Sequence, residues 1–369
     1  MINKRSIKLF LSNCKEKFYI WRFFLIKEKD YVSIQAKLLA KWLNNARTHV
    51  PYYYKLMEGI EKIDSTNSMR ILKMLPLLDK KIILEEGNNI YNRRINNKWK
   101  GWHNTGGSTG NPLRFPIGGF RWHFSSELCC QAYLYKLMCG SYSIKISSID
   151  GRRVEQDLID KHIYWGTNDN HFPYGKTHYS TMYLSEDTFS YYIDHINQEK
   201  PEIMRGYPSG FYQLAKYMEQ GGGKLRFQLK GIYLTSEDIA EHQLRLIQEQ
   251  FKCPIWGQYG HSEASVFAIR YPNSEEYYCH PLYGFTEVIG TDGKHVEEGG
   301  IGEVVVTGFN YTALPFIRYR TGDLAEYGGK KWICCSAQVN GEILGLHNYE
   351  NERKTLFGRV YIRWTSKGI

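Results

Sequence analysis

Apolar residues recur at two spacings along this chain, and the two spacings alternate over much of its length. Between residues 32 and 42 they fall on one face of a helix, which we expect to end at Val50-Pro51 because proline interrupts helical hydrogen bonding. From residue 203 onward, short apolar runs predict strands and longer amphipathic runs predict helices; the strands are expected at 203–206, 230–234 and 254–258, and the helices at 211–220 and 238–251. This alternation predicts an α/β fold with a parallel sheet covered by helices.

Further helices and a set of shorter strands complete the predicted architecture. The first sixty residues are expected to be largely helical, and helices are also expected over 121–138 and 184–198. Ser185 or Asp187 is the expected N-cap of the helix over 184–198, and Thr235-Ser236 that of the helix over 238–251. Glycine turns separate short strands expected at 284–290, 302–307 and 316–318, which indicate an appended β-rich subdomain.

Composition adds limits to this picture. A chain of 369 residues exceeds what one hydrophobic core usually serves, so two or three packed subdomains are expected. The eight cysteines form no CxxC pair, and charges interrupt the apolar N-terminal stretch, so neither a metal ribbon nor a secretory signal is indicated. No run of 18 apolar residues is present, so we expect no transmembrane helix and a reduced, cytoplasmic protein.

The net charge of +10 comes from basic residues that are scattered rather than clustered, so a nucleic-acid partner is not expected. The segment from Lys15 to Lys27 mixes basic and aromatic side chains and has two interpretations. It can be a membrane-surface helix, or a helix that packs its aromatic residues on the body of the protein, and the second is the commoner arrangement.

A loop rich in Gly, Ser and Thr is the sharpest local feature of the sequence. It runs from Thr105 through Gly106, Gly107, Ser108, Thr109 and Gly110 to Asn111-Pro112. Small residues let a backbone approach a polyanion closely, and their N–H groups and hydroxyls supply hydrogen-bond donors. No Gly-Lys-Ser/Thr follows, so this is not a Walker loop, and such a stretch taken alone is more often a flexible turn.

Two downstream motifs change the interpretation of that loop. They are Gln258-Tyr259-Gly260-His261-Ser262-Glu263 and Tyr319-Arg320-Thr321-Gly322-Asp323-Leu324. In this order and at these distances, the three motifs resemble those of the adenylate-forming superfamily over about residues 40–325. Within it the chain looks most similar to the phenylacetate–CoA ligase branch, including members of capsular polysaccharide biosynthesis. Tyr207-Pro208-Ser209 and Leu234-Thr235-Ser236-Glu237 fit that branch.

The resemblance implies an enzyme that joins a carboxylic acid to AMP with ATP and magnesium. Thr105, Ser108, Thr109 and Gly110 would then close over the triphosphate, although Asn111 stands where relatives often have Lys. Glu263 would hold magnesium, and Tyr259 would stack on adenine near Ser236 and Glu237. Asp323 would accept hydrogen bonds from both ribose hydroxyls, with Arg320 as a phosphate partner or as an ion-pair partner of Asp323.

The acid itself cannot be chosen from the sequence. Its pocket is expected among residues 121–210, near the carboxyl ends of the parallel strands. Aromatic and His candidates there are Trp122, His123, Trp165, His171, Phe172 and Tyr207. Cys279-His280 and Cys334-Cys335 resemble segments that hold zinc in some relatives, but adjacent cysteines of a strand face opposite sides, so zinc is not expected.

The expected domains are an AMP-binding body over residues 1–325, which includes the N-terminal helical segment, and a remnant over residues 326–369. Relatives continue past the ribose-binding Asp into a mobile lid with a Lys, and residues 345–349 match its hinge poorly. The leading hypothesis is an acid-activating, AMP-forming ligase, with CoA or a surface polysaccharide as candidate acceptor and a lid on a separate chain as a candidate partner. The alternative is a nucleotide-binding relic or scaffold derived from such an enzyme.

Overall fold

The computed structural model describes residues 16–60, 62–95, 101–105, 112–118, 127–168, 172–329 and 360–364. They divide into two compact units. Unit 1 comprises residues 1–130, 260–268 and 275–369, and unit 2 comprises residues 131–259 and 269–274. The chain passes from one unit to the other after residues 130, 259, 268 and 274.

Unit 2 is built on a mainly parallel sheet, as the alternating pattern predicted. Its strands lie in the order β8-β7-β6-β3-β5-β4; their bounds are Ile255–Gly260, Gly231–Thr235, Ile203–Gly206, Ile146–Asp150, Thr177–Ser180 and Trp165–Thr167. All neighbours are parallel except β4, which runs antiparallel to β5. The β6, β7 and β8 strands confirm the three strands expected from the apolar runs.

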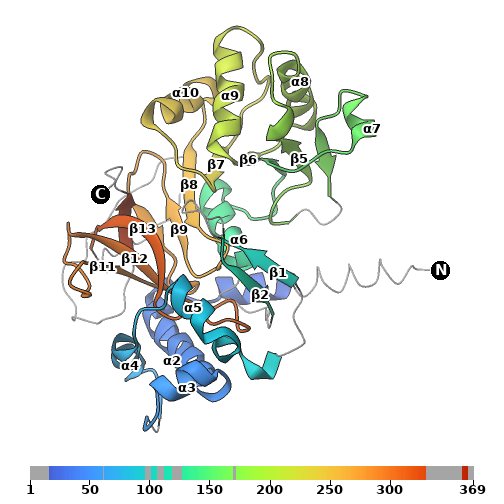
Figure 1. The fold of residues 1–369 in the computed structure, drawn as a ribbon. Helices are drawn as coiled ribbons and strands as arrows, with labels where there is room; N and C mark the ends of the chain where they lie inside the picture. Colours follow the sequence, from blue (N-terminus) through green and yellow to red (C-terminus); the bar gives the residue numbers. More distant parts are fainter. Residues whose placement is uncertain are drawn as a thin grey trace. The chain divides into compact units, whose positions relative to one another are not determined.

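Helices cover both faces of this sheet. Alternate residues of a strand point to opposite faces, so one buried strand contacts helices on both sides. On one face, Ile232 and Leu234 of β7 belong to a core shared with α8 (Phe189–Glu199), α9 (Pro208–Glu219) and α10 (Glu241–Phe251), which lie together in Figure 1. On the other face, Tyr233 accepts a hydrogen bond of 2.9 Å from Gln131 Nε2 of α6 (Glu127–Cys139). The short elements of unit 2 are α7 (Gln156–Ile159) and η4 (Thr181–Tyr183).

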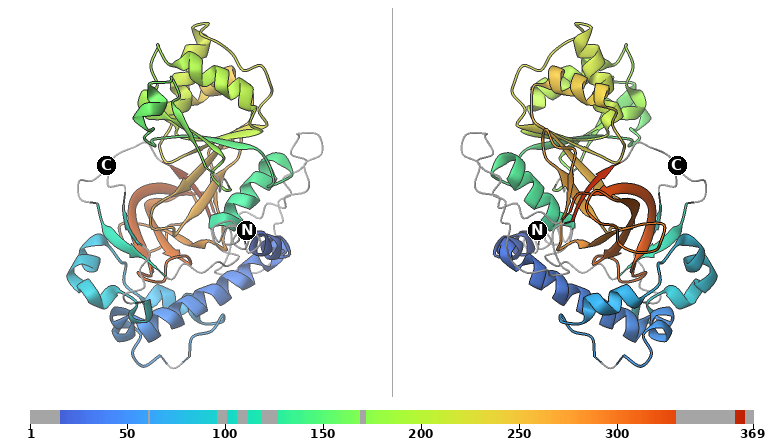
Figure 2. Two further views of the ribbon diagram at one scale, coloured as in Figure 1. Left: turned by 90° about the vertical axis from the view of Figure 1, so that its right-hand side faces the viewer. Right: turned by 90° about the vertical axis from the view of Figure 1, so that its left-hand side faces the viewer.

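Unit 1 combines an antiparallel sheet with helices. The strands lie in the order β11-β12-β13-β14-β10, and β11 to β13 curve strongly in Figure 2; the bounds are Gly284–Ile289, Ile301–Gly308, Tyr319–Tyr327, Val360–Trp364 and Tyr277–Cys279. A hairpin, β1 (Gly101–Asn104) and β2 (Arg114–Ile117), pairs separately. The helices are η1 (Glu28–Asp30), α2 (Tyr31–His49), α3 (Pro51–Leu56), α4 (Ser68–Met74), α5 (Lys80–Glu86), η2 (Gly87–Ile90) and η3 (Arg93–Ile95).

The long helix α2 holds the sheet of unit 1 through a polar and an aromatic contact. Gln35 Nε2 donates a buried hydrogen bond of 2.9 Å to Gly284 O at the start of β11, and the ring of Trp42 lies 6.2 Å from that of Phe309. The predicted end of the helix at Val50-Pro51 is confirmed, and Pro51 opens α3 at a position where no backbone N–H is needed.

Some predicted boundaries were wrong. Helix α8 begins at Phe189 after Thr188, not at Ser185 or Asp187, because the Ser185 carbonyl accepts the N–H groups of Thr188 and Phe189 in a preceding turn. Helix α10 begins at Glu241 after Ala240, whose N–H donates to Gln243 Oε1 at 3.1 Å, so Thr235-Ser236 is not its cap. Helix α6 covers Glu127–Cys139, within the helix expected over 121–138, and residues 121–126 of that expectation lie outside the described residues.

The strand expected at 316–318 was also wrong. Arg318 has a φ of +50°, a left-handed conformation that breaks an extended run, and the strand β13 starts only at Tyr319.

The segment near the N-terminus shows features of both interpretations. Phe23 is buried with its ring 5.5 Å from that of His280, as expected for a helix packed on the body. Phe18 and Trp21 are 50% and 56% exposed, so not every aromatic residue is covered. Within the described ranges, no helix combines the length and the apolar character needed to cross a bilayer.

Candidate functional site

A bulge in β13 places Asp323 on the surface of unit 1. Val305 of β12 pairs with Arg320, and Glu303 pairs with Leu324, so one residue of β12 faces three residues of β13. Gly322, in the middle of the three, has a φ of +83°, which L side chains rarely adopt. Bulges of this kind re-aim side chains. Here the result is an exposed Asp323 at a fixed place on the strand.

The bulge is held by hydrogen bonds on both sides. Glu303 accepts from Gly322 N at 3.1 Å and from Arg320 Nε at 2.7 Å. The Thr321 hydroxyl donates to Val304 O at 2.8 Å and accepts from Asp323 N at 3.1 Å. Arg320 therefore forms its ion pair with Glu303, where the sequence had suggested Asp323 or a phosphate.

A buried ion pair anchors the chain just before the bulge. Arg318 and Glu287 make two parallel contacts, Nε to Oε2 and Nη2 to Oε1, each of 3.1 Å, and both residues are buried. Arg318 Nη1 also donates to Leu75 O at 2.8 Å. This fork-to-fork geometry fixes a guanidinium in place as well as pairing its charge. The role of Arg318 is thus to position β13.

Glu263 lies in the turn after β8 and is 6% exposed. His261 Nδ1 lies 3.0 Å from its Oε2. Burial alone raises the pKa of Glu263, but His261, together with the Glu263 backbone and Tyr319, outweighs burial and holds that pKa below its usual value. A carboxylate in this state is ionised at neutral pH and suited to a hard cation.

Two glycines of the sheet, Gly284 and Gly308, let the turn that contains Glu263 pack closely against the strands. Ser265 Oγ donates to Glu263 O at 3.0 Å and so belongs to the same turn. A Cβ added at Gly284 would lie 2.1 Å from Ser265 O, and one added at Gly308 would lie 2.4 Å from Ser265 Oγ. Both spacings are too short for a side chain, so the sequence needs Gly at these strand positions to hold the turn.

Tyr319 connects the two predicted site carboxylates of unit 1. Burial raises the pKa of its phenol, and the carboxylates of Glu263 and Asp323 raise it further. Asp79 acts in the same direction. Glu263 and Asp323, far apart in sequence, therefore both lie near enough to Tyr319 to act on its phenol electrostatically.

Thr105 closes the base of the predicted phosphate loop. Its N–H donates to Leu113 O at 2.9 Å, and its hydroxyl accepts from Leu113 N at 2.8 Å. This pair of bonds joins the two ends of the loop. The loop residues Gly106, Gly107, Ser108, Thr109, Gly110 and Asn111 lie outside the described residues.

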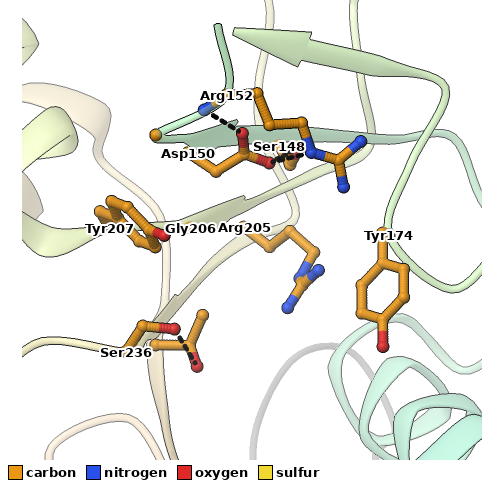
Figure 3. A pocket seen from close by; sticks show the side chains of 10 residues that line it. Ser148, Asp150, Arg152, Tyr174, Arg205, Gly206, Tyr207 and Ser236 are labelled. Carbon is orange, nitrogen blue, oxygen red and sulfur yellow. Dashed lines mark hydrogen bonds and ion pairs between the residues drawn. The ribbon is translucent and has the colours of Figure 1, made fainter. Parts of the chain in front are cut away.

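Unit 2 contains a hollow of about 360 Å³ at the carboxyl ends of β3, β6 and β7. Figure 3 shows the side chains that line it; they are Ser148, Asp150, Gly151, Arg152, Tyr174, Arg205, Gly206, Tyr207, Thr235 and Ser236. The ends of parallel strands are the usual ligand position in such sheets, which is where the acid pocket was expected.

Among the acid-pocket candidates, the hollow contains Tyr207. Trp165 instead stacks on His195 with ring centroids 3.9 Å apart, and Phe172 packs edge-on against Tyr135 at 6.0 Å. Trp122, His123 and His171 lie outside the described residues, as do Cys334 and Cys335. No cluster of three potential metal ligands occurs within the described residues.

The sequence analysis missed Ser148, Asp150, Arg152, Tyr174 and Arg205 as pocket residues. The available signal was the position of Arg205, a basic residue inside a short apolar strand that runs directly into Tyr207-Pro208-Ser209. A charged residue at such a place lies at the carboxyl end of a strand, where ligands bind.

The predicted adenine contacts of unit 2 lie at the ends of β7 and β8. Ser236 lines the hollow and has a φ of +73°. Glu237 Oε2 accepts a hydrogen bond of 3.0 Å from Ser209 N, in the first turn of α9, so this carboxylate joins two strand–helix turns. Tyr259 is half-buried near the end of β8.

Comparison with known proteins agrees with this architecture. No family model matches the chain. Protein CapK of Staphylococcus aureus is 25% identical over 322 residues, 86% of this chain and 68% of that protein. An open conformation of 2-hydroxyisobutyryl-CoA ligase in complex with 2-HIB-AMP and CoA superposes with a TM-score of 0.59 at 18% identity, over 80% of this chain and 70% of that one.

A second structure of that ligase, in the postadenylation state with 2-HIB-AMP, gives a TM-score of 0.61 at 18% identity and covers 83% of this chain and 65% of that one. The chain thus spans about two thirds of the length of these proteins. The chain is thus similar to CapK over most of its length and has the fold of an acyl-CoA ligase, the fold that the resemblance to the adenylate-forming superfamily predicted.

Proposed function

From its place among the adenylate-forming proteins, we propose that this chain activates a carboxylic acid with ATP as an acyl-adenylate. The observation that carries the proposal is that unit 1 holds both carboxylates near Tyr319, with Glu263 buried in the turn after β8 and Asp323 exposed on the bulge of β13. A buried ionised carboxylate and an exposed one, held on rigid turns, are what a metal–nucleotide complex requires.

Asp323 is the proposed ribose ligand. A carboxylate accepts hydrogen bonds from two neighbouring hydroxyls at once, and charged acceptors form stronger bonds than neutral ones. The bulge that carries Asp323 is fixed by Glu303 and Thr321, so the carboxylate is oriented before ligand binding. Such preorganisation lowers the entropic cost of binding.

Glu263 fits magnesium better than a softer metal. Mg²⁺ commonly takes one or two protein carboxylates and fills its other positions with water and phosphate oxygens. One ionised carboxylate, without a cluster of three ligands in the described part of the chain, matches that pattern. Bound magnesium would offset the negative charge of the phosphate groups.

In the proposed reaction, a carboxylate oxygen of the acid bonds to the α-phosphorus of ATP, the bond from that phosphorus to the bridging oxygen breaks, and pyrophosphate leaves. The residues of unit 1 hold the nucleotide, and Thr105 holds the base of the loop that the resemblance assigns to the triphosphate. The hollow of unit 2 binds the acid. CoA or another acyl acceptor would take the acyl group in a second step.

Acid-dependent exchange of radiolabelled pyrophosphate into ATP tests this proposal. Purified protein with magnesium should show exchange with at least one acid of a panel of aliphatic, aromatic, hydroxylated and dicarboxylic acids. Glu263→Gln should lower that exchange roughly 100-fold, since about 2.7 kcal/mol of lost transition-state stabilisation gives that factor. Glu186→Gln is the matched control, because Glu186 is exposed in unit 2.

ATP binding without exchange for any acid would overturn the ligase and favour a nucleotide-binding relic. Exchange that is equal in wild type and Glu263→Gln would remove Glu263 from the reaction while leaving the ligase in place.

A further inference from the structure

Residues 16–24, where the described part of the chain begins, are helical and pack one side on unit 1. Ile20 and Phe23 lie about one turn apart on this side and are 2% and 1% exposed. The ring of Phe23 lies 5.5 Å from that of His280, which is also buried. These contacts fix which side of the helix faces the protein, so its opposite side faces outward.

The outward side carries three large apolar side chains. Phe18, Trp21 and Leu25 follow one another at helical spacing and are 50%, 56% and 60% exposed. Leu25 lies in the turn that ends the helix, and its N–H still donates to Trp21 O at 3.3 Å. The rings of Phe18 and Trp21 lie 6.0 Å apart. We call these three residues the exposed stripe; a group of apolar side chains on one surface marks an interaction site more often than a single one does.

The exposed charges around the stripe are all basic. Within residues 16–29, every exposed charged side chain is a Lys or an Arg; they are Lys17, Arg22, Lys27 and Lys29. The two acidic residues of this range, Glu16 and Glu28, are buried and half-buried. Residues 1–29 contain eight Lys and Arg and two Glu, an excess of six positive charges where the whole chain has +10. Although no run of like charges occurs, the excess charge is therefore greatest at this end of the sequence.

Apolar side chains on one side of a helix, with basic residues around them, match the surface of an anionic membrane. Such a helix lies in the membrane interface with its apolar residues among the headgroups, and the nearby Lys and Arg are attracted to anionic lipids. Trp suits this depth because its ring is apolar and its N–H is polar. A protein partner fits less well, since a stable protein interface buries about 800 Å² per partner and is depleted in Lys.

We propose that this helix attaches the protein to the surface of an anionic membrane, with the exposed stripe inserted among the lipid headgroups. The two interpretations of the segment then apply to its two sides, because Ile20 and Phe23 pack on the body while the stripe contacts lipid. Attachment of this kind is reversible, since a few apolar side chains and charges bind far more weakly than a spanning helix. It needs neither nucleotide nor acid, so the inference is independent of the proposed ligase.

Flotation of the whole chain with vesicles tests the proposal without any mutation. Vesicles of phosphatidylcholine alone are compared with vesicles that contain about one third phosphatidylglycerol, an anionic lipid. The protein should bind the anionic vesicles at least roughly 10-fold more tightly. Salt at about 1 M should reduce this difference, because it shortens the Debye length from about 10 Å to about 3 Å. Absence of binding to both kinds of vesicle, or equal binding to both at low salt, would overturn the proposal.

Two double variants of equal charge assign the attraction to this helix. Lys17→Gln combined with Lys27→Gln should weaken binding to the anionic vesicles roughly 25-fold, about fivefold for each charge near the membrane. The control is Lys161→Gln combined with Lys224→Gln, which removes the same charge from exposed positions of unit 2. An equal loss of binding in both would show that the charge of the whole protein attracts the lipid, and the helix would lose its assignment.

The stripe is tested by a matched pair of leucines. Leu25→Ser should weaken vesicle binding roughly 10-fold, as expected when a Leu side chain is no longer buried. Leu84→Ser is the control, because Leu84 is 72% exposed on α5 and lies outside the stripe. Vesicle binding by Leu25→Ser that equals that of the wild type would take the stripe out of the interface.

Insertion itself is measured with brominated phosphatidylcholine in the anionic vesicles, because bromine quenches Trp fluorescence on contact. The chain has nine Trp, so the wild type is compared with Trp21→Phe, which keeps the stripe apolar and removes one reporter. The wild type should lose the larger fraction of its fluorescence. Equal quenching in the two proteins would show that Trp21 does not enter the membrane.

The remaining outcomes separate attachment from self-association and from the ligase. A dimer that Leu25→Ser dissociates, seen by light scattering in protein that does not bind vesicles, would overturn the membrane in favour of a second copy of the chain. If Leu25→Ser does not fold, its melting temperature shows it, and the Lys17 and Lys27 double variant decides the question. Pyrophosphate exchange without vesicle binding would leave the ligase standing and overturn the attachment, and vesicle binding without exchange would do the reverse.

Discussion

The two candidate carboxylates of unit 1 are positioned by the backbone, whereas Arg205 of unit 2 is positioned by neighbouring side chains. In unit 1, a bulge with a left-handed Gly322 carries Asp323, and close-packed glycines hold the Glu263 turn. In unit 2, two tyrosine rings hold Arg205. The difference suits the proposed ligands, since a metal–nucleotide needs fixed carboxylates and the hollow proposed for the acid contains this guanidinium.

For unit 1, the comparison distinguishes substitutions that lower stability from substitutions that weaken only ligand binding. Damage to the backbone frame of unit 1 should affect stability and site together. Loss of an exposed group such as Asp323 should weaken ligand binding and leave the stability of the ligand-free protein nearly unchanged. The predictions below are ordered from the largest expected effect to the smallest.

The largest effect is expected from Glu287→Ala. It leaves the Arg318 guanidinium buried beside the start of β13 without its carboxylate, which costs roughly 3–5 kcal/mol in buried pairs. Urea unfolding measures the loss. Glu241→Ala is the matched control, because the Glu241–Arg245 pair is exposed and such pairs contribute about 0–1 kcal/mol. If both variants lose the same small amount of stability, the Arg318–Glu287 pair does not frame unit 1.

The next effect is expected from Asp323→Ala. ATP with magnesium should stabilise the wild type by mass action, and the variant should lose most of that stabilisation. The lost hydrogen bonds to a charged acceptor correspond to roughly 2–3 kcal/mol. Since Asp323 is exposed, the stability of the ligand-free protein should change by no more than about 0.5 kcal/mol.

Thermal unfolding with and without ATP measures both quantities for Asp323→Ala. Asp323→Asn serves as the conservative variant and should retain part of the ATP shift, because it keeps an acceptor but not the charge. A full ATP shift in Asp323→Ala would show that the ribose is bound elsewhere.

Much of the fold could be predicted from the pattern of apolar positions. The strands at 203–206, 230–234 and 254–258 were found because each is a short apolar run that ends at turn residues. The starts of α8 and α10 were missed because Ser185 and Ser236 are good caps in isolation, yet the chain uses them in turns. The preference of a residue for the cap position does not reveal this, because the position of the helix start depends on which carbonyl groups already accept hydrogen bonds in the preceding turn.

The candidate site divides in the same way. Glu263 and Asp323 were identified because each belongs to a motif that is continuous in sequence. Arg205 was missed because its only mark in the sequence is its position in a short apolar strand. The rings around it belong to Tyr174 and Tyr233, which the fold brings in from other segments. Strand 316–318 failed for a related reason, since Arg318 has a left-handed φ and pairs with Glu287, which is distant in sequence.

The smallest effect is expected from Glu237, which tests whether side chains position the turns of unit 2. Its carboxylate accepts the Ser209 N–H in the first turn of α9, where a negative charge also interacts favourably with the helix dipole. Glu237→Ala should therefore cost about 1 kcal/mol of unfolding free energy, as for loss of a helix cap, and Glu237→Gln should cost less because its amide oxygen still accepts. Asp238→Ala, an exposed neighbour, is the control. The resemblance assigns Glu237 to adenine as well, and ATP titrations of the same variants decide between the two roles. A change in ATP affinity without any change in unfolding free energy would make Glu237 a nucleotide contact and not a cap.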